Sequence, residues 1–500
     1  MLSTRRALIF GGVGGLGVAV VAMWRAQRRR STAQQSGPIL VSTRAGRSMQ
    51  LAAVGSRAGT SYALHRARRV FADAARREEL DTRYQLHTAE QVADALGNMK
   101  GALMKLGQMA SYLDQGLPEP VRDALAQLQQ DAPPMAPELA AQVVTDELGS
   151  PPDVLFAEWD PLPIAAASIG QVHRAMTHDG RAVAVKVQYP GIDEAIRGDL
   201  GNASMLFQAM TLLFPGLDPG PIVAELRARL IEEVDYKLEA DNQRLFANFY
   251  ANHPFIDVPA VLDEWCSARV ITTELAEGVR YSELLTWSQA ERDLAAEAIY
   301  RYVFGSIYRL HAFNGDPHPG NYLFRPGGKV SFLDYGLVKR FGQVELVVFE
   351  DMITKWALEH DVPGFRKVVE RVGFLKPGQP FSDEEVGAYF GHFYEFVDAD
   401  REMTMDEAYA SETVRRFFDA TGPFADIMRA ANLPPGMVII QRINLGLYAI
   451  LGELHATANW RRIAEEIWPF VGRAPSTEFG RQEAAWLAEH RPIGLVTGSS

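Results

Sequence analysis

A chain of 500 residues is too long for one hydrophobic core, so two or more domains are expected. Apolar residues make up 47% of the chain and charged residues 22%, which is an ordinary balance for a globular protein. The single cysteine, Cys266, excludes a disulfide framework and suits a reducing compartment.

The net charge of −12 is unevenly distributed. The first 72 residues contain twelve arginines, no lysine and no acidic residue, which leaves 38 basic and 62 acidic residues for the remainder. A basic arm on an acidic body predicts contact with an anionic surface, either membrane phosphates or nucleic acid. Because the arm lacks interleaved aromatic residues, no nucleic-acid partner is expected.

The chain opens with an uncharged, mostly apolar run of eighteen residues, Ala7–Trp24, flanked by arginines on both sides. This is the short end for a membrane-spanning helix, and five glycines weaken it. The heavier positive charge after the run predicts a single-pass inner- or plasma-membrane anchor with the body in the cytoplasm. A peripheral or disordered N-terminus is the alternative.

Gly12–Gly17 also fits G-x-G-x-x-G, the motif of a dinucleotide-binding site. Such a site requires an acidic residue about 20 positions later, but no acid precedes Asp73, which argues against this interpretation.

A linker is predicted over residues 31–60, and a basic helix that suits a lipid surface over residues 61–77. The next helix, over residues 89–113, contains Lys105 and Gln108. These two residues are three apart and therefore share one helix face. Taken alone, such a pair is ordinary solvated surface.

From residue 161 the pattern changes to short apolar runs. Residues 164–173 are expected to form a small-residue loop, in the place of a kinase's glycine-rich loop. Its alanines and serine are Ala165, Ala166, Ala167 and Ser168. Asp179-Gly180 then predicts a hairpin turn, and Ala182–Val187 predicts a buried strand that holds one lysine, Lys186.

A lysine in a buried strand is costly unless it is paired. The predicted partner of Lys186 is Glu239, which follows on a helical segment. The strand matches the V-A-I-K strand of kinases, whose lysine holds the α- and β-phosphates of ATP. Val270–Gly278 predicts a strand that ends in a hinge between two lobes, with Glu274 beside the adenine.

Three polar residues then follow a kinase spacing: Asp316, Asn321 five positions on, and Asp334 before a Tyr-Gly pair. The protein-kinase signature H-R-D-x-x-x-x-N followed by D-F-G has the same skeleton. One carboxylate orients the nucleophile, while an amide oxygen and a second carboxylate hold Mg²⁺ against the phosphates. A proline-rich turn and a hairpin would be the non-functional interpretation. Beyond Lys339 the chain is expected to be mostly helical.

With these motifs in order, the chain resembles the UbiB/AarF protein-kinase-like family, the bacterial relatives of the ADCK proteins. The motifs that carry the resemblance are Lys105-Leu106-Gly107-Gln108, Ala165–Ser168, Val183–Lys186, Glu233-Val234-Asp235, Glu239, Asp316–Asn321 and Asp334-Tyr335-Gly336. Two departures are Asn314, where many members carry a histidine, and Tyr335, which replaces phenylalanine.

The resemblance implies an α+β, two-lobed protein-kinase-like fold with an N-terminal helical extension and a largely helical C-terminal lobe. The predicted divisions are 1–30 membrane anchor, 31–88 basic linker and arm, 89–160 helical extension, 161–278 N-lobe, 279–475 C-lobe and 476–500 tail.

The resemblance also implies ATP and Mg²⁺ as cofactors. Lys186, fixed by Glu239, would hold the phosphates, Asn321 and Asp334 would bind Mg²⁺, and Asp316 would orient the attacking group. Residues 165–168 and Glu274 would contact the nucleotide. The helix of Lys105 and Gln108 would form a cap over the site, near Glu233 and Asp235, that blocks protein substrates.

The family is associated with ATP hydrolysis or small-molecule phosphorylation and with isoprenoid quinone biosynthesis. The sequence is therefore interpreted as a membrane-associated atypical kinase or ATPase, with membrane lipids, quinone precursors and quinone-biosynthesis enzymes as partners. The alternative is a non-catalytic scaffold that binds nucleotide and lipid. An ordinary Ser/Thr kinase is disfavoured because it needs no Lys105 cap and prefers glycines where Ala165–Ala167 stand.

Overall fold

The structure is a computed structural model that describes residues 135–490, apart from 168, 194–230, 233, 316, 419–421, 433–443 and 445. The apolar run, the basic arm and the Lys105–Gln108 helix lie outside these residues, as do Ser168, Glu233 and Asp316. Within the described part, no helix combines the length and the apolar character that a membrane crossing requires.

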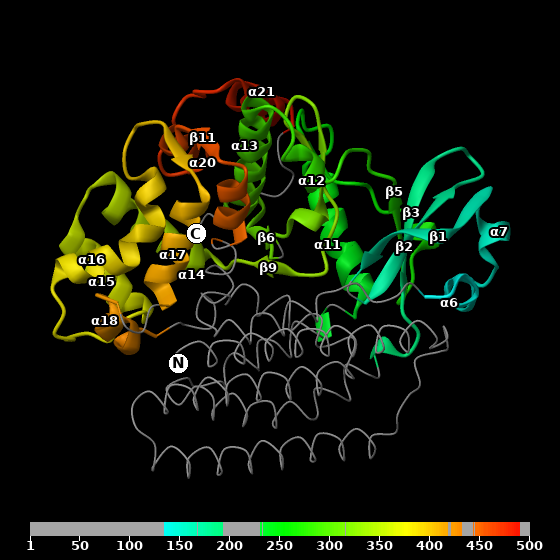
Figure 1. The fold of residues 1–500 in the computed structure, drawn as a ribbon, viewed down its shortest axis with the longest axis horizontal. Coiled ribbons are helices and arrows are strands. Elements are labelled where there is room, and N and C mark those ends of the chain that lie inside the picture. The colour runs from blue at the N-terminus through cyan, green and yellow to red at the C-terminus, as the bar shows by residue number, and fades with distance from the viewer. Residues whose placement is uncertain are drawn as a thin grey trace, which may run out of the picture. The chain divides into compact units, whose positions relative to one another are not determined.

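The N-terminal lobe contains a four-stranded antiparallel sheet in the order β1-β2-β3-β5 (Figure 1). Its strands are β1 (Glu158–Ala167), β2 (Gly170–Met176), β3 (Ala182–Gln188) and β5 (Val270–Glu274). Val183, Val185 and Val187 alternate along β3 and are fully buried, as expected for a strand with one face on a core. Helix α6 (Pro137–Leu148) packs against this sheet, followed by the short α7 (Pro152–Leu155).

The expected loop over residues 164–173 is wrong, because its alanines belong to strand β1. Ala165 pairs with Val172 and Ala167 pairs with Gly170, so only a tight turn separates β1 from β2. Pairing satisfies the backbone groups that a buried loop would leave unpaired. A glycine is needed at position 170, since a Cβ there would lie 2.3 Å from the carbonyl oxygen of Val187.

Helix α11 (Tyr236–Phe249) follows the sheet's third strand in sequence and packs against β5. It begins at Asp235, whose carboxylate accepts hydrogen bonds from the backbone N–H groups of Lys237 and Leu238, a common helix N-cap. Its buried face is unusual because it includes three polar residues, Glu239, Asn242 and Gln243.

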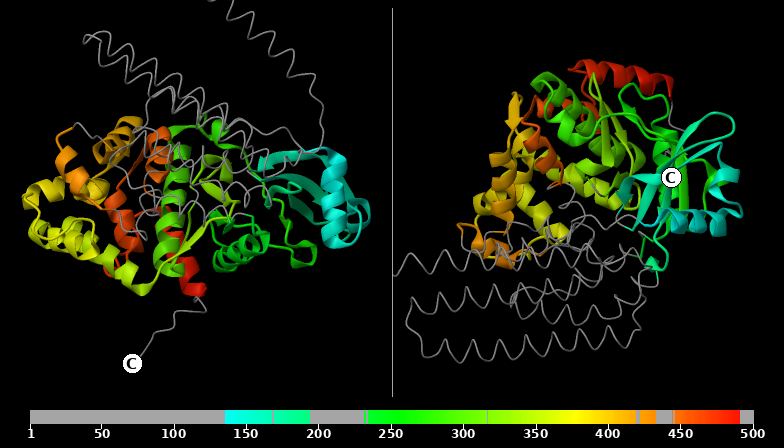
Figure 2. Two further views of the ribbon diagram at one scale, coloured as in Figure 1. Left: turned by 90° about the horizontal axis from the view of Figure 1, so that it is seen from below. Right: turned by 45° about the vertical axis from the view of Figure 1, so that its right-hand side comes forward.

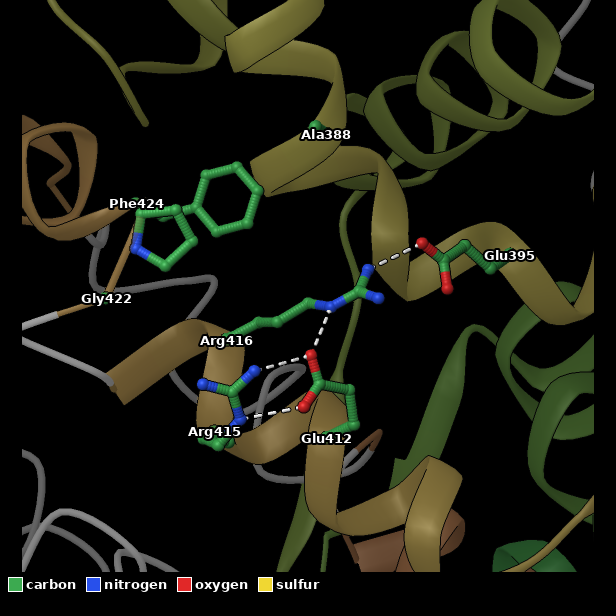
Figure 3. Close-up of a pocket in the computed structure, with 8 residues that line it drawn as sticks. Ala388, Glu395, Glu412, Arg415, Arg416, Gly422 and Phe424 are labelled. Atoms are coloured by element: carbon green, nitrogen blue, oxygen red, sulfur yellow. Dashed lines mark hydrogen bonds and ion pairs between the residues drawn. The ribbon is translucent and has the colours of Figure 1, made fainter.

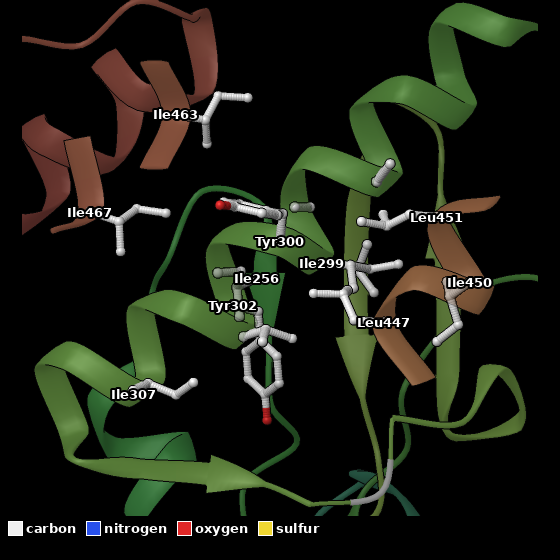
Figure 4. Close-up of a cluster of buried hydrophobic side chains, with 14 of the residues drawn as sticks. Ile256, Ile299, Tyr300, Tyr302, Ile307, Leu447, Ile450, Leu451, Ile463 and Ile467 are labelled. Carbon is white, nitrogen blue, oxygen red and sulfur yellow. The ribbon is translucent and has the colours of Figure 1, made fainter. Parts of the chain in front are cut away.

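The C-terminal lobe is built around helix α13 (Gln289–Gly305), which contacts β8, β11 and α20. Figure 4 shows Ile299, Tyr300 and Tyr302 of α13 among buried isoleucines and leucines of neighbouring helices. A π-helical turn over Ser306–Leu310 ends α13 and leads into strand β6 (Ala312–Asn314).

Three small sheets contain strands that follow α13 in the described part of the chain, and one of them is the antiparallel pair of β10 (Met403–Met405) and β11 (Ala456–Ala458). Strand β6 pairs with β9 (Val338–Arg340), while β7 (Tyr322–Arg325) and β8 (Lys329–Phe332) form a hairpin that β4 (Ile256–Asp257) extends. The other elements are α12 (Tyr281–Leu284), α14 (Gln343–Ile353), α15 (Val362–Val372), α16 (Asp383–Phe390), α17 (Glu407–Phe418), α18 (Ala425–Ala430), α20 (Trp460–Ile467) and α21 (Glu478–Glu489).

Buried ion pairs tie the last two helices to α13. The guanidinium of Arg301, 1% exposed, contacts the carboxylates of Glu297, Glu466 and Glu483 at 2.6–2.9 Å. Glu466 lies on α20 and Glu483 on α21, which Figure 2 shows in red beside α13. The described part of the chain therefore has the expected α+β architecture, with a mainly helical C-terminal lobe.

Stability of the C-terminal lobe is predicted to depend on pH through His392, which is 1% exposed. Burial lowers the pKa of His392 to about 4. The unfolded chain takes up this proton near pH 6.5, so the free energy of unfolding should fall by roughly 3 kcal/mol between pH 6.5 and pH 4. Urea denaturation across this range measures the slope. His392→Gln should flatten it, and equal slopes in both proteins would contradict the assignment.

Candidate active site

Lys186 lies at the centre of the candidate site. Its Nζ is 2.6 Å from Oε1 of Glu239 and 3.4 Å from Oδ2 of Asp334. The ring of Tyr236 lies below the ammonium, with its centroid 5.1 Å from Nζ. The structure thus brings together three of the residues that the sequence singled out. Glu239 lies 53 positions after Lys186 in the chain, and Asp334 lies 148 positions after it.

The electrostatics of this triangle keep the lysine charged. Burial alone would lower the pKa of Lys186, but the carboxylates of Asp334 and Glu239 outweigh that effect and hold it well above its ordinary value. The side chain of Glu239 is 3% exposed, whereas that of Asp334 is 29% exposed. The site therefore has one buried anchor, Glu239, and one carboxylate that solvent reaches, Asp334.

Asp334 sits in a segment whose backbone is held from several sides. Its own Oδ1 accepts a hydrogen bond from the N–H of Gly336 at 3.0 Å. The side-chain amide of Asn314, on β6, donates to the carbonyl of Asp334. The Tyr335 ring is fully buried, and its hydroxyl accepts a hydrogen bond from that of Tyr302 at 2.9 Å.

The β7–β8 hairpin places Asn321 near Asp334. Tyr322 pairs with Phe332 at the open end of the hairpin, and the N–H of Leu333 donates to the carbonyl of Asn321 at 3.0 Å. Asn321 directly precedes β7, and Asp334 comes two residues after the end of β8, so both residues lie at the open end of the hairpin. A partly exposed carboxylate and a neighbouring amide oxygen are hard oxygen donors, which fit Mg²⁺.

The predicted hinge begins at Glu274, an exposed residue at the end of β5. Its N–H donates to the carbonyl of Ala260 at 2.9 Å. Four residues later Gly278, with φ +147°, comes so close to β7 that a Cβ would lie 2.9 Å from the Phe324 carbonyl oxygen. Arg280 then donates to the carbonyl of Ile164 at 3.2 Å, which joins this segment to the β1 strand of Ala165–Ala167.

Other predicted site residues are placed only in part. Lys105, Gln108, Ser168, Glu233 and Asp316 lie outside the described residues. Asp235 is exposed and caps helix α11.

Fixed positions flank residue 316 on both sides. The N–H of Gly315 donates to the carbonyl of Leu337 at 2.7 Å, and Pro317 packs so closely on Gly446 that a Cβ there would lie 2.7 Å from its ring.

Sequence reasoning missed two residues of this region, Tyr236 and Asn242. Tyr236 supplies the aromatic floor under Lys186. Asn242 donates from Nδ2 to the carbonyl of Tyr335 at 3.2 Å. Both are three positions from Glu239 on a predicted helix, so the shared helix face was the available signal.

A separate pocket of about 310 Å³ lies in the C-terminal lobe and is lined by none of these residues. Figure 3 shows that its charged side chains face one another: Arg416 contacts Glu395 and Glu412, and Arg415 also contacts Glu412. Hydrogen bonds from Arg415 and Arg416 lower the pKa of Glu412 to about 2. Its charges are therefore satisfied internally.

The two-lobed fold and the lysine–glutamate–aspartate triangle define an atypical protein-kinase-like domain. A family model described as the ABC1 atypical kinase-like domain matches residues 127–368. A solved structure described as the complex of Rv3197 and erythromycin from Mycobacterium tuberculosis is 31% identical and covers 79% of this chain and 99% of that chain, with a TM-score of 0.58. The chain belongs to the ABC1 atypical kinase-like family, the UbiB/AarF group that its motifs resemble.

Two curated relatives are mitochondrial atypical kinases. COQ8 of Saccharomyces cerevisiae is 27% identical, over 76% of this chain and 76% of the relative. COQ8B of Rattus norvegicus is 34% identical, over 51% of this chain and 48% of the relative. This chain thus spans about half the length of the rat protein. The predicted family and the two-lobed kinase-like fold are confirmed.

The triangle predicts a strong effect of Lys186→Met on stability. Without the ammonium, the buried carboxylate of Glu239 faces Asp334 with no cation between them, which should lower the free energy of unfolding by about 3 kcal/mol at pH 7. Adding Glu239→Gln should recover part of this loss. Urea denaturation of the single and double variants measures both effects. Lys355→Met, in a more exposed ion pair, is the control, and an equal loss there would contradict a buried triangle.

Proposed function

We propose that this protein is an ATP- and Mg²⁺-dependent atypical kinase or ATPase that supports isoprenoid quinone or related lipid biosynthesis at a membrane. The observation that carries the proposal is the position of Lys186, whose ammonium is 2.6 Å from buried Glu239 and 3.4 Å from the more exposed Asp334. A charged lysine fixed beside a solvent-accessible carboxylate is what binding of Mg²⁺ and phosphates requires.

In this proposal each residue has a positioning or electrostatic role. Lys186, fixed by Glu239, contacts the α- and β-phosphates. The oxygens of Asp334 and Asn321 hold Mg²⁺, which neutralises the charge of the phosphates when bound. Asp316 orients the attacking hydroxyl group or water molecule. Phosphoryl transfer depends mainly on such positioning and charge stabilisation, which these side chains would supply.

The proposed cap would restrict the acceptor. Lys105 and Gln108 lie outside the described residues, but one of their expected partners, Asp235, is exposed at the start of α11, the helix that carries Glu239. A helix docked there through Lys105 and the acids Glu233 and Asp235 would cover the site. Such a cover favours water or a small molecule over a protein as acceptor.

The quinone and membrane roles rest on different observations. The named relatives are mitochondrial atypical kinases of the COQ8 type, and the resembled family is associated with isoprenoid quinone biosynthesis. The membrane role rests on the apolar run Ala7–Trp24 with its arginine flanks. Quinone precursors, membrane lipids and quinone-biosynthesis enzymes are the partners that this role implies.

Asp334→Asn is predicted to abolish Mg²⁺-dependent ATP turnover, because the amide cannot replace the carboxylate charge at the metal. The measurement is phosphate release by the purified full-length protein. Asp400→Asn, a matched change at a surface carboxylate paired with Arg462, should retain activity. Full turnover by Asp334→Asn would exclude the proposed metal role.

The biosynthetic role predicts a change in quinone content when the gene is deleted. Lipid and quinone profiling should show this loss, with recovery on complementation by the wild type and no recovery with Lys186→Met or Asp334→Asn at equal protein abundance. Recovery with both variants would favour the non-catalytic scaffold, and an unchanged quinone profile in the deletion strain would exclude the quinone role.

A further inference from the structure

Asn242 contacts both the segment that contains Asp334 and the strand that follows it, β9. It is 3% exposed and lies on α11, three positions after Glu239. Its Nδ2 donates to the carbonyl of Tyr335 at 3.2 Å, and its Oδ1 accepts a hydrogen bond from Nη2 of Arg340 at 3.3 Å. One side-chain amide therefore joins helix α11 both to the middle of the segment between β8 and β9 and to the last residue of β9.

These contacts form a closed circuit of residues around the site. Lys186 contacts Asp334 and Glu239, and α11 connects Glu239 to Asn242. Asn242 returns to the peptide group between Tyr335 and Gly336, whose N–H donates to Oδ1 of Asp334 at 3.0 Å. This circuit is compact, because a Cβ at Gly336 would lie 3.4 Å from Oδ1 of Asp334 and 3.6 Å from Oε2 of Glu239. A shift of the Tyr335 peptide therefore moves the Asp334 carboxylate relative to the lysine.

Other contacts hold the Tyr335 side chain without Asn242. Its ring packs against Phe246 with centroids 5.0 Å apart, and its hydroxyl accepts a hydrogen bond from that of Tyr302. Loss of the Asn242 amide would therefore leave the ring anchored and release the peptide group. Removal of the Asn242 amide is therefore expected to change the position of Asp334 without disrupting the packing of the core.

We propose that Asn242 is a positioning residue that fixes the Asp334 carboxylate relative to the Lys186–Glu239 pair and so sets the Mg²⁺ affinity of the nucleotide site. The proposal rests on the proposed function, because it requires that Asp334 binds Mg²⁺ with nucleotide. It assigns Asn242 no contact with the substrate. Arg340 assists by holding the amide in the orientation that presents Nδ2 to Tyr335.

The test is a variant that removes the amide at similar size and without new charge, Asn242→Leu. The binding of ADP to the purified full-length protein is measured by calorimetry, first in EDTA and then across a Mg²⁺ titration. The Mg²⁺ concentration at half-maximal enhancement of ADP affinity should rise about tenfold, as expected for loss of one buried hydrogen bond. The ADP affinity in EDTA should stay unchanged.

The neighbouring Gln243 supplies a matched control. It is also buried on α11, and its Nε2 donates to the carbonyl of Pro259 at 2.8 Å, outside the Asp334 segment. Gln243→Met should lower thermal stability and leave the Mg²⁺ midpoint unchanged. Equal midpoint shifts in Gln243→Met and Asn242→Leu would show general loosening of the helix and overturn the proposal, as would an unchanged midpoint in Asn242→Leu.

Arg340→Met decides the matter if Asn242→Leu fails to fold, because Arg340 is exposed. It should raise the Mg²⁺ midpoint about two- to threefold, as expected for a weakened contact, and no shift would overturn the proposal. The wild type separates the two levels of inference. If its ADP binding does not respond to Mg²⁺, the proposed function fails and this inference with it. If it responds and neither variant shifts the midpoint, only this inference fails.

Discussion

The buried charge of Lys186 is the constraint on which the rest of the site depends. A lone ammonium in a strand between buried valines would lose its hydration without compensation. Here Glu239 and Asp334 compensate, from a helix and from the segment that follows a hairpin of the other lobe. Strand β3, helix α11 and the end of β8 must therefore meet at one point. The same convergence places a solvent-accessible carboxylate beside a fixed cation, which is the requirement for binding metal and phosphate.

Helix α11 shows how the fold accommodates this constraint. A helix at a lobe boundary ordinarily buries an apolar stripe, yet α11 buries Glu239, Asn242 and Gln243. Each has a matched partner: Lys186, the Tyr335 carbonyl and the Pro259 carbonyl. Satisfied polar groups in a low-dielectric interior favour one arrangement over others, because an unmatched group there is costly. The helix thus fixes geometry at the site in addition to burying Tyr236, Ala240 and Phe246 in the core.

The sequence was most informative where a residue conflicted with its surroundings. Lys186 in an apolar strand required a carboxylate, and Glu239 is that partner. The alanine-rich segment was wrongly predicted to be a loop. Residues 165–167 give no strong strand signal of their own and form part of β1 through pairing with β2. The shared helix face places Asn242 beside Glu239, but the partners of Asn242 and Asn314 are 93 and 20 positions away, so no local pattern identified those partners. The N-cap of α11 at Asp235 could have been predicted from the sequence, since an aspartate before a helix is a common N-cap.

The most direct test of the central claim is to locate the metal. Crystals of the full-length protein grown with ADP and Mn²⁺ in place of Mg²⁺ would show the metal by its anomalous scattering. The account predicts a peak at about 2–2.5 Å from side-chain oxygens of both Asp334 and Asn321, with the phosphates in contact with Lys186. A peak elsewhere, or bound ADP away from Lys186, would contradict it.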